Sequence, residues 1–256
     1  MGSMPGHTTV LAGYRNSPAE IARARDLMDI VPKNLSTVLD IGARDGHFSH
    51  LLTEHFESVT ALDLTMPQFH LDRVLPVQGD ATKLQFPDNY FDVVFCAEVL
   101  EHIPALDKAC SEIARVARHA VVIGVPYRQD TRLDRTTCNH CRKTNPPWGH
   151  VNTFDEHKVS SLFPACRATR TSFVGSTNER TNSFSAWLMD LAGNPWGVYE
   201  QDESCIHCGK QMSPPTSRPF AQKLIAAMAL RLTRLQEEFN PTHPNWIHMV
   251  LQKDVR

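Results

Sequence analysis

Two Cys-x-x-Cys pairs carry the clearest metal-binding chemistry of the sequence: Cys138 with Cys141, and Cys205 with Cys208. Each spacing lets two thiolates reach one metal ion from a tight turn, and four thiolates complete a closed tetrahedral zinc site. Residues 142–204 separate the pairs, whereas a local zinc ribbon has roughly 15–20 intervening residues, so the pairs would join distant segments. We therefore predict a structural zinc site with all four cysteines as ligands.

A closed site of four thiolates leaves no open position on the metal, so substrate activation by zinc is not expected. A redox pair and separately buried cysteines are the alternatives. A redox Cys-x-x-Cys normally begins a helix, whose dipole lowers the thiol pKa, and neither stretch has that context. His140 and His207 lie between the paired cysteines and are second-choice ligands.

The stretch VLDIGARDG, residues 38–46, has the composition of a ligand-binding turn. A glycine turn between a strand and a helix lets a ligand approach the backbone, and the helix start presents free N–H groups to an anionic group. The dinucleotide pattern G-x-G-x-x-G is not met, because the glycines stand only at positions 42 and 46.

The same stretch resembles the first motif of class I S-adenosylmethionine-dependent methyltransferases, D-x-G-x-G-x-G, which Asp40, Gly42 and Gly46 match. Arg44 replaces the middle glycine, and this departure predicts an ordinary backbone φ at that position. The resemblance implies that the turn, including Ala43 and Arg44, binds S-adenosylmethionine.

Further blocks similar to that family follow in order. Asp63 ends a buried run about 20 residues later, where the family's acidic residue accepts hydrogen bonds from the ribose hydroxyls. GDATKLQFPDNYFDVV resembles the next block, in which Asp80 would accept from the adenine amino group and the Ala81 N–H would donate to the ring. AEVLEHIP resembles the block after strand four. Over residues 36–126 the resemblance thus implies these further cofactor-binding residues: Asp63, Leu64, Gly79, Asp80, Ala81, Ala97 and Glu98.

The elements that position these residues can be predicted from local patterns. Residues 18–31 are predicted to be a helix, with Ser17 as N-cap, Pro18 at the first helical position and Glu20 completing a capping box. Apolar, β-branched runs then alternate with amphipathic segments, which predicts a parallel sheet with right-handed crossovers. The expected fold is α/β: a doubly wound, seven-stranded Rossmann-like sheet with the last strand antiparallel. A zinc-clasped lid would form from the insertions after strands 5 and 6, over the ligand crevice.

The chain divides into six segments. They are an N-terminal helical segment (1–35), the cofactor-binding core (36–126), an inserted loop with the first cysteine pair (127–153), a core helix and strand (154–175), a second insertion with the second pair (176–216), and a C-terminal helix with the last strand (217–256). The long helix of the last segment carries Leu224, Met228, Leu232 and Leu235 at helical spacing. We interpret this stripe as core, with a dimer face or a pocket wall as alternatives.

Methyl transfer to a hydroxyl group needs a residue that removes a proton, and histidine is the usual choice. The chain has 13 histidines. His150, just before the helix that leads to strand six, is the first catalytic candidate, although it could instead fix the start of that helix. His102, after strand four, is the second, with a structural or cleft-lining role as its alternative. Tyr127, Arg128 and Trp148 are candidate substrate contacts.

Composition limits the function further. The 256 residues are 41% hydrophobic and 21% charged, enough for a sizeable core. The net charge of −2 argues against a nucleic-acid partner. No run approaches the ~20 apolar residues of a membrane span, and MGSMPGHTTV is not a signal peptide. The single cysteines Cys96, Cys110 and Cys166 stand in apolar contexts, which favours burial in a reducing, cytoplasmic location.

Together these features favour a cytoplasmic S-adenosylmethionine-dependent methyltransferase that acts on a small molecule, as a monomer or homodimer. The expected reaction is O-methylation of a sugar, nucleotide-sugar or other biosynthetic intermediate. An RNA or protein methyltransferase that holds a macromolecule through the zinc module is the alternative. A non-catalytic, cofactor-binding partner is the third, because Arg44 departs from the motif.

Overall fold

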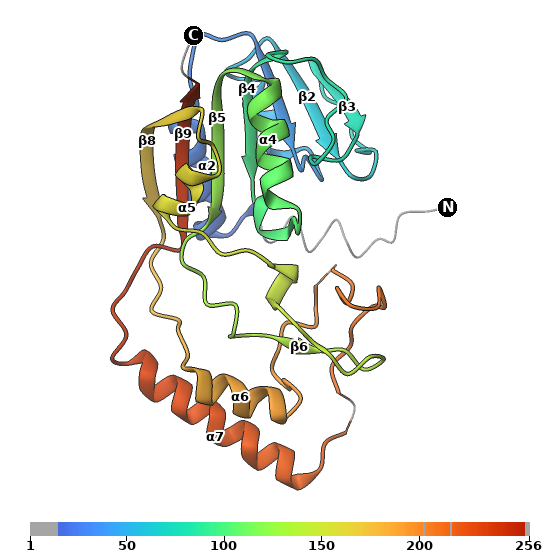
Figure 1. The fold of residues 1–256 in the computed structure, drawn as a ribbon, viewed down its shortest axis with the longest axis vertical. Helices are drawn as coiled ribbons and strands as arrows, with labels where there is room; N and C mark the ends of the chain where they lie inside the picture. Colours follow the sequence, from blue (N-terminus) through green and yellow to red (C-terminus); the bar gives the residue numbers. More distant parts are fainter. Residues whose placement is uncertain (1–14, 202, 216, 254–256) are drawn as a thin grey trace. The chain divides into compact units, whose positions relative to one another are not determined.

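The computed structural model describes residues 15–201, 203–215 and 217–253, so residues 1–14 of the predicted N-terminal segment, with MGSMPGHTTV, lie outside it. The described residues form two compact units, both drawn in Figure 1. The first unit comprises the described residues up to Tyr127, Phe154–Gly175, and those from Pro244 onward; the second comprises Arg128–Thr153 and Ser176–His243. The chain therefore passes between the units four times, and neither unit is one contiguous segment.

The first unit is built on a seven-stranded sheet with the strand order β3-β2-β1-β4-β5-β9-β8 (Figure 1). Neighbours among β1 to β5 pair in parallel, whereas β9 is antiparallel to both β5 and β8. The predicted Rossmann-like sheet with an antiparallel last strand is thus confirmed. The strands are β1 (Thr37–Ile41), β2 (Ser58–Asp63), β3 (Val74–Gln78), β4 (Phe91–Ala97), β5 (Ala117–Pro126), β8 (Cys166–Val174) and β9 (Trp246–Lys253).

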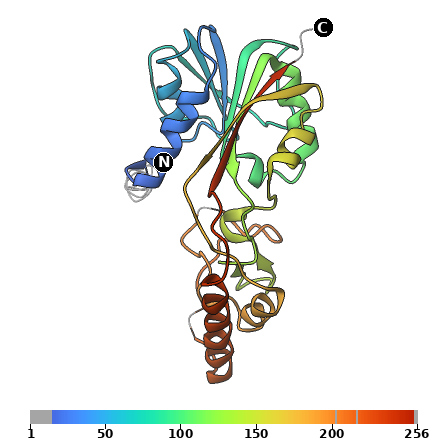
Figure 2. The same cartoon turned by 90° about the vertical axis from the view of Figure 1, so that its left-hand side faces the viewer.

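Helices cover both faces of this sheet, as Figures 1 and 2 show. Successive residues of a strand point to opposite faces, so a strand covered on both sides reads as a continuous apolar run. In β4, Val94 packs in the layer under α4, and Val93 and Phe95 pack in the layer under α2 and α3. The helices are α2 (Pro18–Ile30), α3 (His47–Leu52), η1 (Leu100–His102), α4 (Leu106–Val116) and α5 (Glu156–Ser161).

The start of α2 differs from its prediction in one contact. Ser17 caps the helix as expected, since its Oγ accepts a hydrogen bond from Glu20 N at 3.2 Å. The second contact of the predicted capping box, in which the Glu20 carboxylate accepts from the backbone N–H of Ser17, is wrong. The Glu20 carboxylate instead binds the buried guanidinium of Arg23 at 2.8 Å. A buried arginine without a carboxylate would be strongly destabilising, so this pairing takes precedence over the cap.

The second unit contains little sheet. β6 (Thr136–Thr137) and β7 (Thr144–Asn145) form a short hairpin whose turn carries the first cysteine pair, and η2 (Pro147–Gly149) follows. Helices α6 (Ser183–Leu191) and α7 (Phe220–Glu237) pack against each other. None of the helices that the structure describes is long and apolar enough to cross a lipid bilayer.

The apolar stripe of α7 does not lie in a core. Leu224, Met228 and Leu235 are exposed, Leu232 is half-buried, and the buried residues of this helix are small: Ala226, Ala229 and Thr233. The interpretation of the stripe as core is therefore wrong. Small residues let α7 approach its neighbours closely, and the large side chains point outward.

Candidate functional site

The glycine turn joins β1 to α3 at the carboxyl-terminal edge of the sheet. Gly42 and Gly46 both have φ +80°, in the left-handed region that favours glycine. A Cβ on Gly42 would lie 2.3 Å from Val99 Cγ2, and one on Gly46 would lie 2.9 Å from the Phe69 ring. Both positions therefore require glycine for two reasons, backbone conformation and space.

Arg44 differs from its prediction, because its φ is +42° rather than ordinary. The strain is offset by two anchors onto β2. The Arg44 N–H donates to Asp63 Oδ2 at 3.0 Å, and the N–H groups of Gly42 and Ala43 donate to Leu62 O at 2.8 and 3.1 Å. The turn thus keeps a left-handed path at the position where the family motif has its middle glycine. Backbone outliers held by surrounding contacts are typical of functional sites.

The ends of β2 and β3 lie beside this turn. Asp63 accepts from Arg44 N through Oδ2 and from Thr65 N through Oδ1 at 3.3 Å. Leu64 is 70% exposed and Met66 is exposed, so two apolar side chains follow the acid without packing into the core. After β3, Asp80 Oδ1 accepts from Thr82 N at 2.8 Å, and Ala81 is buried. Gly79 N donates to Asp63 O at 2.8 Å, which ties the two strand ends together.

Asp40, the first residue of the motif, is buried under the turn. Its Oδ2 accepts from Ser49 Oγ at 2.5 Å, which connects the end of β1 to α3. Burial raises the pKa of Asp40 to about 7, although the Ser49 hydrogen bond acts in the opposite direction. The protonation state of the carboxyl under the turn therefore changes near neutral pH.

We expect the free energy of unfolding, measured relative to an Asp40→Asn variant, to fall as pH rises from about 4 to about 7. The folded-state pKa of about 7 lies above the unfolded value of about 3.9, so the folded protein holds a proton that the unfolded chain has lost. The change is on the order of 2–4 kcal/mol. Urea unfolding of both proteins below and above this window measures it. An identical pH dependence in both proteins would contradict the burial of a titrating carboxyl at this position.

Residues after β4 contribute a second group of acids and a histidine. Glu98, with φ +58°, follows Ala97, and its Oε1 lies 3.6 Å from Arg23 Nη1. Burial raises the pKa of Glu98, and it raises the pKa of Glu101, which is fully buried in η1, well above its usual range. Burial lowers the pKa of His102 to about 4, helped by the positive charge of Arg44, so this imidazole is neutral near pH 7. Direct contact of Ala97 or Glu98 with a cofactor stays a prediction.

The candidate catalytic and substrate residues divide between the units. Tyr127 belongs to the first, where it is buried, donates from its hydroxyl to Glu156 Oε1 at 2.9 Å and packs edge-on against Phe173. Arg128, Trp148 and His150 belong to the second. Their placement at the substrate, and that of Tyr127, stays a prediction.

His150 is held in one orientation within the second unit. It is buried, and its Nδ1 lies 2.6 Å from Gln129 Oε1, an acceptor. This contact favours the tautomer that carries its proton on Nδ1, which leaves the lone pair on Nε2. Trp148, 6.0 Å away between ring centroids, has φ +50° and is followed by Gly149 at +71°. Two consecutive left-handed residues thus direct the chain into His150.

The four cysteines of the second unit come together. Cys138 Sγ lies 3.7 Å from Cys208 Sγ, and Cys141 Sγ lies 3.6 Å from Cys205 Sγ. The four sulfur atoms lie within 4.8 Å of one another. Four thiolates at 2.3 Å from a tetrahedral zinc ion are about 3.8 Å apart, so the spacing matches such a site. His140 and His207 do not belong to the cluster; the ring Nε2 of His207 lies 3.1 Å from Thr144 O.

The two cysteine turns have the same backbone design. In the first turn, Arg142 N donates to Cys138 O at 2.9 Å, and Cys138 N donates to Lys143 O at 3.0 Å. In the second turn, Gly209 N donates to Cys205 O at 2.8 Å, and Cys205 N donates to Lys210 O at 2.9 Å. Arg142 and Gly209, each directly after the second cysteine of its pair, have φ +61° and +68°. Ile206 N also donates to Asn145 Oδ1 at 3.0 Å, which joins the second turn to β7 of the hairpin that carries the first. Burial would raise the pKa of Cys205, but N–H groups directed at its sulfur lower it to about 6.

Several residues of the turn region have no signal in the sequence that marks them. Ser49 of α3 donates to Asp40 of β1. Val99, two residues after β4, faces Gly42, Phe69 faces Gly46, and Met66 is exposed two residues after Leu64. A residue that only fills space against a glycine can be any of several apolar types, so its role depends on the tertiary structure. Met66 could have been found from its position two residues after Leu64.

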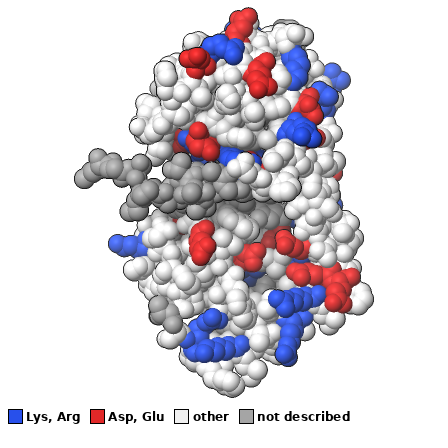
Figure 3. Space-filling view, turned by 180° about the vertical axis from the view of Figure 1, so that it is seen from behind, with Lys and Arg blue, Asp and Glu red and all other residues white. Residues whose placement is uncertain are grey.

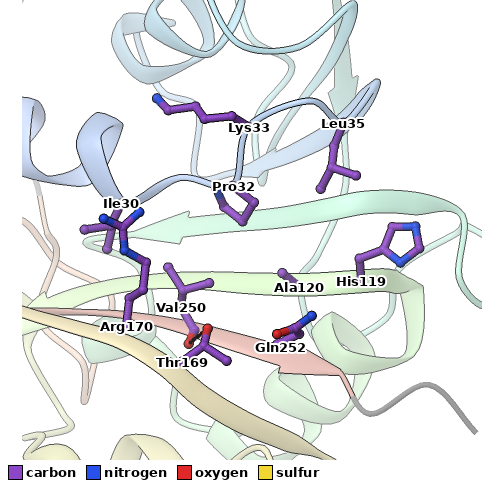
Figure 4. Close-up of a pocket in the computed structure, with 10 residues that line it drawn as sticks. All are labelled: Ile30, Pro32, Lys33, Leu35, His119, Ala120, Thr169, Arg170, Val250 and Gln252. Atoms are coloured by element: carbon purple, nitrogen blue, oxygen red, sulfur yellow. Dashed lines mark hydrogen bonds between the residues drawn. The ribbon is translucent and has the colours of Figure 1, made fainter.

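A cavity of about 430 Å³ lies at the opposite, amino-terminal edge of the sheet (Figure 4). It lies near the starts of β1 and β5 and the end of the antiparallel β9, and none of the predicted site residues lines it. Its apolar floor carries Val250 and Ala120, with cationic side chains around it. The face drawn in Figure 3 exposes both basic and acidic side chains, without a continuous basic surface.

The segment that carries the glycine turn is similar to known methyltransferases. Residues 39–123 match the family model described as a methyltransferase domain. The uncharacterized methyltransferase YcgJ of Bacillus subtilis (strain 168) is 27% identical over 141 residues, 50% of this chain and 55% of that protein. The malonyl-acyl-carrier-protein O-methyltransferase of Pectobacterium atrosepticum is 30% identical over 132 residues, 48% of this chain and 51% of that protein.

A shorter stretch of 54 residues is 44% identical to the sterol 24-C-methyltransferase ERG6B of Gibberella zeae, which covers 21% of this chain and 14% of that protein. The chain thus spans about half the length, or less, of these curated relatives. The crystal structure of YcgJ superposes with a TM-score of 0.55 at 15% identity, over 92% of this chain and 99% of that one, and has the same fold. The resemblance of the cofactor-binding segment to class I S-adenosylmethionine-dependent methyltransferases is therefore confirmed.

Proposed function

We propose that the protein is an S-adenosylmethionine-dependent methyltransferase that methylates a small molecule, with oxygen as the acceptor atom. The observation that carries this proposal is the turn between Gly42 and Gly46. It leaves no room for side chains on either glycine and is tied to Asp63 by the Arg44 amide. Such a turn lets a ligand lie against the backbone, with a carboxylate beside it to accept from a diol.

The residues at this edge of the sheet fit S-adenosylmethionine. Asp63 retains lone pairs for the ribose hydroxyls, exposed Leu64 and Met66 offer apolar surface for the adenine ring, and Asp80 with Ala81 follows at the end of β3. When bound, this cofactor supplies a methyl group on a sulfonium for in-line displacement. The work of the protein is to hold donor and acceptor in line and exclude water, which accounts for much of the rate of such reactions.

His150 is the proposed general base, and His102 is the second candidate. The contact of His150 Nδ1 with Gln129 supports a ring orientation in which Nδ1 carries a proton and Nε2 would act as the base. His102, with a pKa of about 4, is neutral near pH 7, but so weak a base accepts a proton less readily. Tyr127, Arg128 and Trp148 are proposed to contact the acceptor.

A structural zinc ion bound by Cys138, Cys141, Cys205 and Cys208 completes the proposal. Sulfur–sulfur distances of 3.6 and 3.7 Å and the two matched turns support a tetrahedral site. All four positions are filled by thiolates, so the metal would organise the second unit and not the reaction.

The acceptor class is supported by relatives named for a sterol and for malonyl-acyl-carrier protein, and by the lack of a continuous basic surface on the face drawn in Figure 3. A macromolecular acceptor remains as the alternative, in which the zinc module would hold RNA or a protein. Transfer RNA that binds with the salt dependence of several phosphate contacts would overturn the small-molecule proposal.

Calorimetry with S-adenosylhomocysteine tests the cofactor site. We expect the wild-type protein to bind, and Asp63→Asn to bind at least about tenfold more weakly, because one carboxylate oxygen that accepts from the ribose is replaced by an amide nitrogen. The matched control is Asp72→Asn, which neutralises an exposed acid outside the site. Equal affinities of the wild type and Asp63→Asn would show that Asp63 is not part of the cofactor site. Absence of binding to the wild type would overturn both the small-molecule and the macromolecular methyltransferase proposals.

A further inference from the structure

The outward face of α7 carries large apolar side chains from its first residue to the turn that follows the helix. Phe220, Leu224, Met228, Leu235 and Phe239 form this surface, here called the α7 stripe; Phe220 is 81% and Phe239 80% exposed. Phe239 lies just after the helix, in a turn where its N–H donates to Gln236 O at 3.0 Å. Single exposed apolar residues are ordinary, but four along one helix face, with a fifth in the turn that follows, mark an interaction site.

The spacing of the stripe is symmetric. With Arg231, which lies on the same face, the positions are 220, 224, 228, 231, 235 and 239, so the steps of four, four, three, four and four residues read the same in both directions. A two-fold axis perpendicular to a helix brings the face into contact with its own reversed copy. A symmetric row is the pattern that such a contact needs.

We propose that a second copy of this chain binds the α7 stripe, with the two α7 helices antiparallel about a two-fold axis. In this register Phe220 meets Phe239 of the second copy, and Leu224 meets Leu235 of the second copy. Met228 lies beside the aliphatic part of Arg231 of the second copy, whose guanidinium reaches solvent at the rim. Every apolar residue of the stripe thus gains an apolar neighbour.

The flanks of the stripe agree with the same register. On one flank, half-buried Ile225 lies opposite Leu232 of the second copy, so apolar meets apolar. On the other flank, Lys223 lies opposite Glu238 of the second copy, so opposite charges meet. A parallel pairing would instead place Glu238 against Glu238 of the second copy, and like charges there would repel.

The area is sufficient for a stable dimer. Given the exposed fractions of the five stripe residues, they present roughly 600 Å² of side-chain surface per copy. Two copies would bury roughly 1,200 Å², the lower end of the range for specific interfaces, before the flanks are counted.

A lipid surface fits the stripe less well. Interfacial helices keep charges off the apolar face and favour basic residues next to it. Here Arg231 interrupts the apolar face, and the last residues, Glu237 and Glu238, are acidic. The charge pattern therefore favours a protein surface with complementary charges, which the second copy provides.

Sedimentation velocity on the full chain tests the proposal. The wild type is expected at twice the chain mass of 28.8 kDa. Leu224→Lys and Leu235→Glu, tested singly, are each expected to weaken the dimer at least about a hundredfold, because a charge is buried against leucine. The double variant Leu224→Lys/Leu235→Glu is expected to regain at least about tenfold, since the introduced lysine then faces the introduced glutamate of the second copy.

The matched control is Leu75→Glu, an exposed leucine of β3 in the first unit, which should leave the dimer unchanged. A monomeric wild type, or single variants that dimerise as the wild type does, would overturn the proposal. Absence of rescue in the double variant would overturn the antiparallel register. A monomeric wild type that floats with phosphatidylcholine–phosphatidylglycerol vesicles would identify the stripe as a lipid-binding face instead.

Discussion

Replacement of Cys205 by serine is expected to abolish zinc binding and to unfold the part of the second unit that surrounds the four cysteines. The apolar cluster there consists of Cys138, Tyr199, Cys205 and Met212, two of which are proposed ligands, so little packing remains once the metal is lost. Structural zinc contributes about 10–16 kcal/mol in zinc-finger peptides at neutral pH, far more than such a cluster can replace.

Elemental analysis and limited proteolysis measure this effect. The wild type should contain one zinc ion per chain, and the variant almost none, with new cleavage within 128–153 and 193–215. Cys166→Ser is the matched control, because Cys166 is a half-buried cysteine of β8 outside the cluster. A Cys205→Ser variant that keeps its zinc and its resistance to protease would show that the four sulfurs are not a structural metal site.

The Gly42→Ala variant is expected to lose affinity for S-adenosylhomocysteine by about a thousandfold or more, which corresponds to about 4 kcal/mol. Two costs combine. The φ of +80° disfavours any residue with a Cβ, and that Cβ would lie 2.3 Å from Val99 Cγ2, so the turn must move away from its present path. Because the ligand is proposed to lie against this backbone, a displaced turn no longer matches it.

Gly193→Ala is the control for the backbone cost to folding, at a position outside the turn. Gly193 also has φ +80°, but a Cβ there has no atom within 4 Å, so the variant carries the backbone strain without the steric clash. It should lose about 1 kcal/mol of stability and bind S-adenosylhomocysteine as the wild type does. Calorimetry, with thermal unfolding as a check of folding, compares the two variants. Unchanged affinity in Gly42→Ala would place the ligand elsewhere.

Much of the first unit could be predicted because its signals are local. The apolar run of β4 and the spacing of Ala109, Ile113 and Val116 in α4 depend only on which faces are buried, and the predicted alternation of apolar runs with amphipathic segments is confirmed there. Cys96 and Cys110 are buried in the core, as their apolar contexts indicated. Likewise, the Cys-x-x-Cys spacing specifies a tight turn, and the structure brings the two turns together.

The failures arise where a distant residue decides the outcome. The φ of Arg44 is set by hydrogen bonds to β2. The Glu20 carboxylate is bound by Arg23 of the same helix, and it is the distant rings of Phe48 and Trp246, packed against the guanidinium, that bury this arginine. The row of Leu224, Met228, Leu232 and Leu235 has the periodicity of a core helix. Periodicity shows only that one face of a helix is apolar, and not whether another element covers that face. Small residues, Ala226 and Ala229, mark the buried face in this helix.

The position of β9 has a consequence for synthesis on the ribosome. Among the strands that the structure describes, β9 comes last in sequence, but it pairs with β5 on one side and β8 on the other. Until Trp246–Lys253 has left the exit tunnel, the nascent sheet lacks its bridge and β8 has no strand to pair with. Loss of Trp246–Lys253 would therefore leave two unpaired strand edges, the kind of surface that chaperones bind and that drives aggregation.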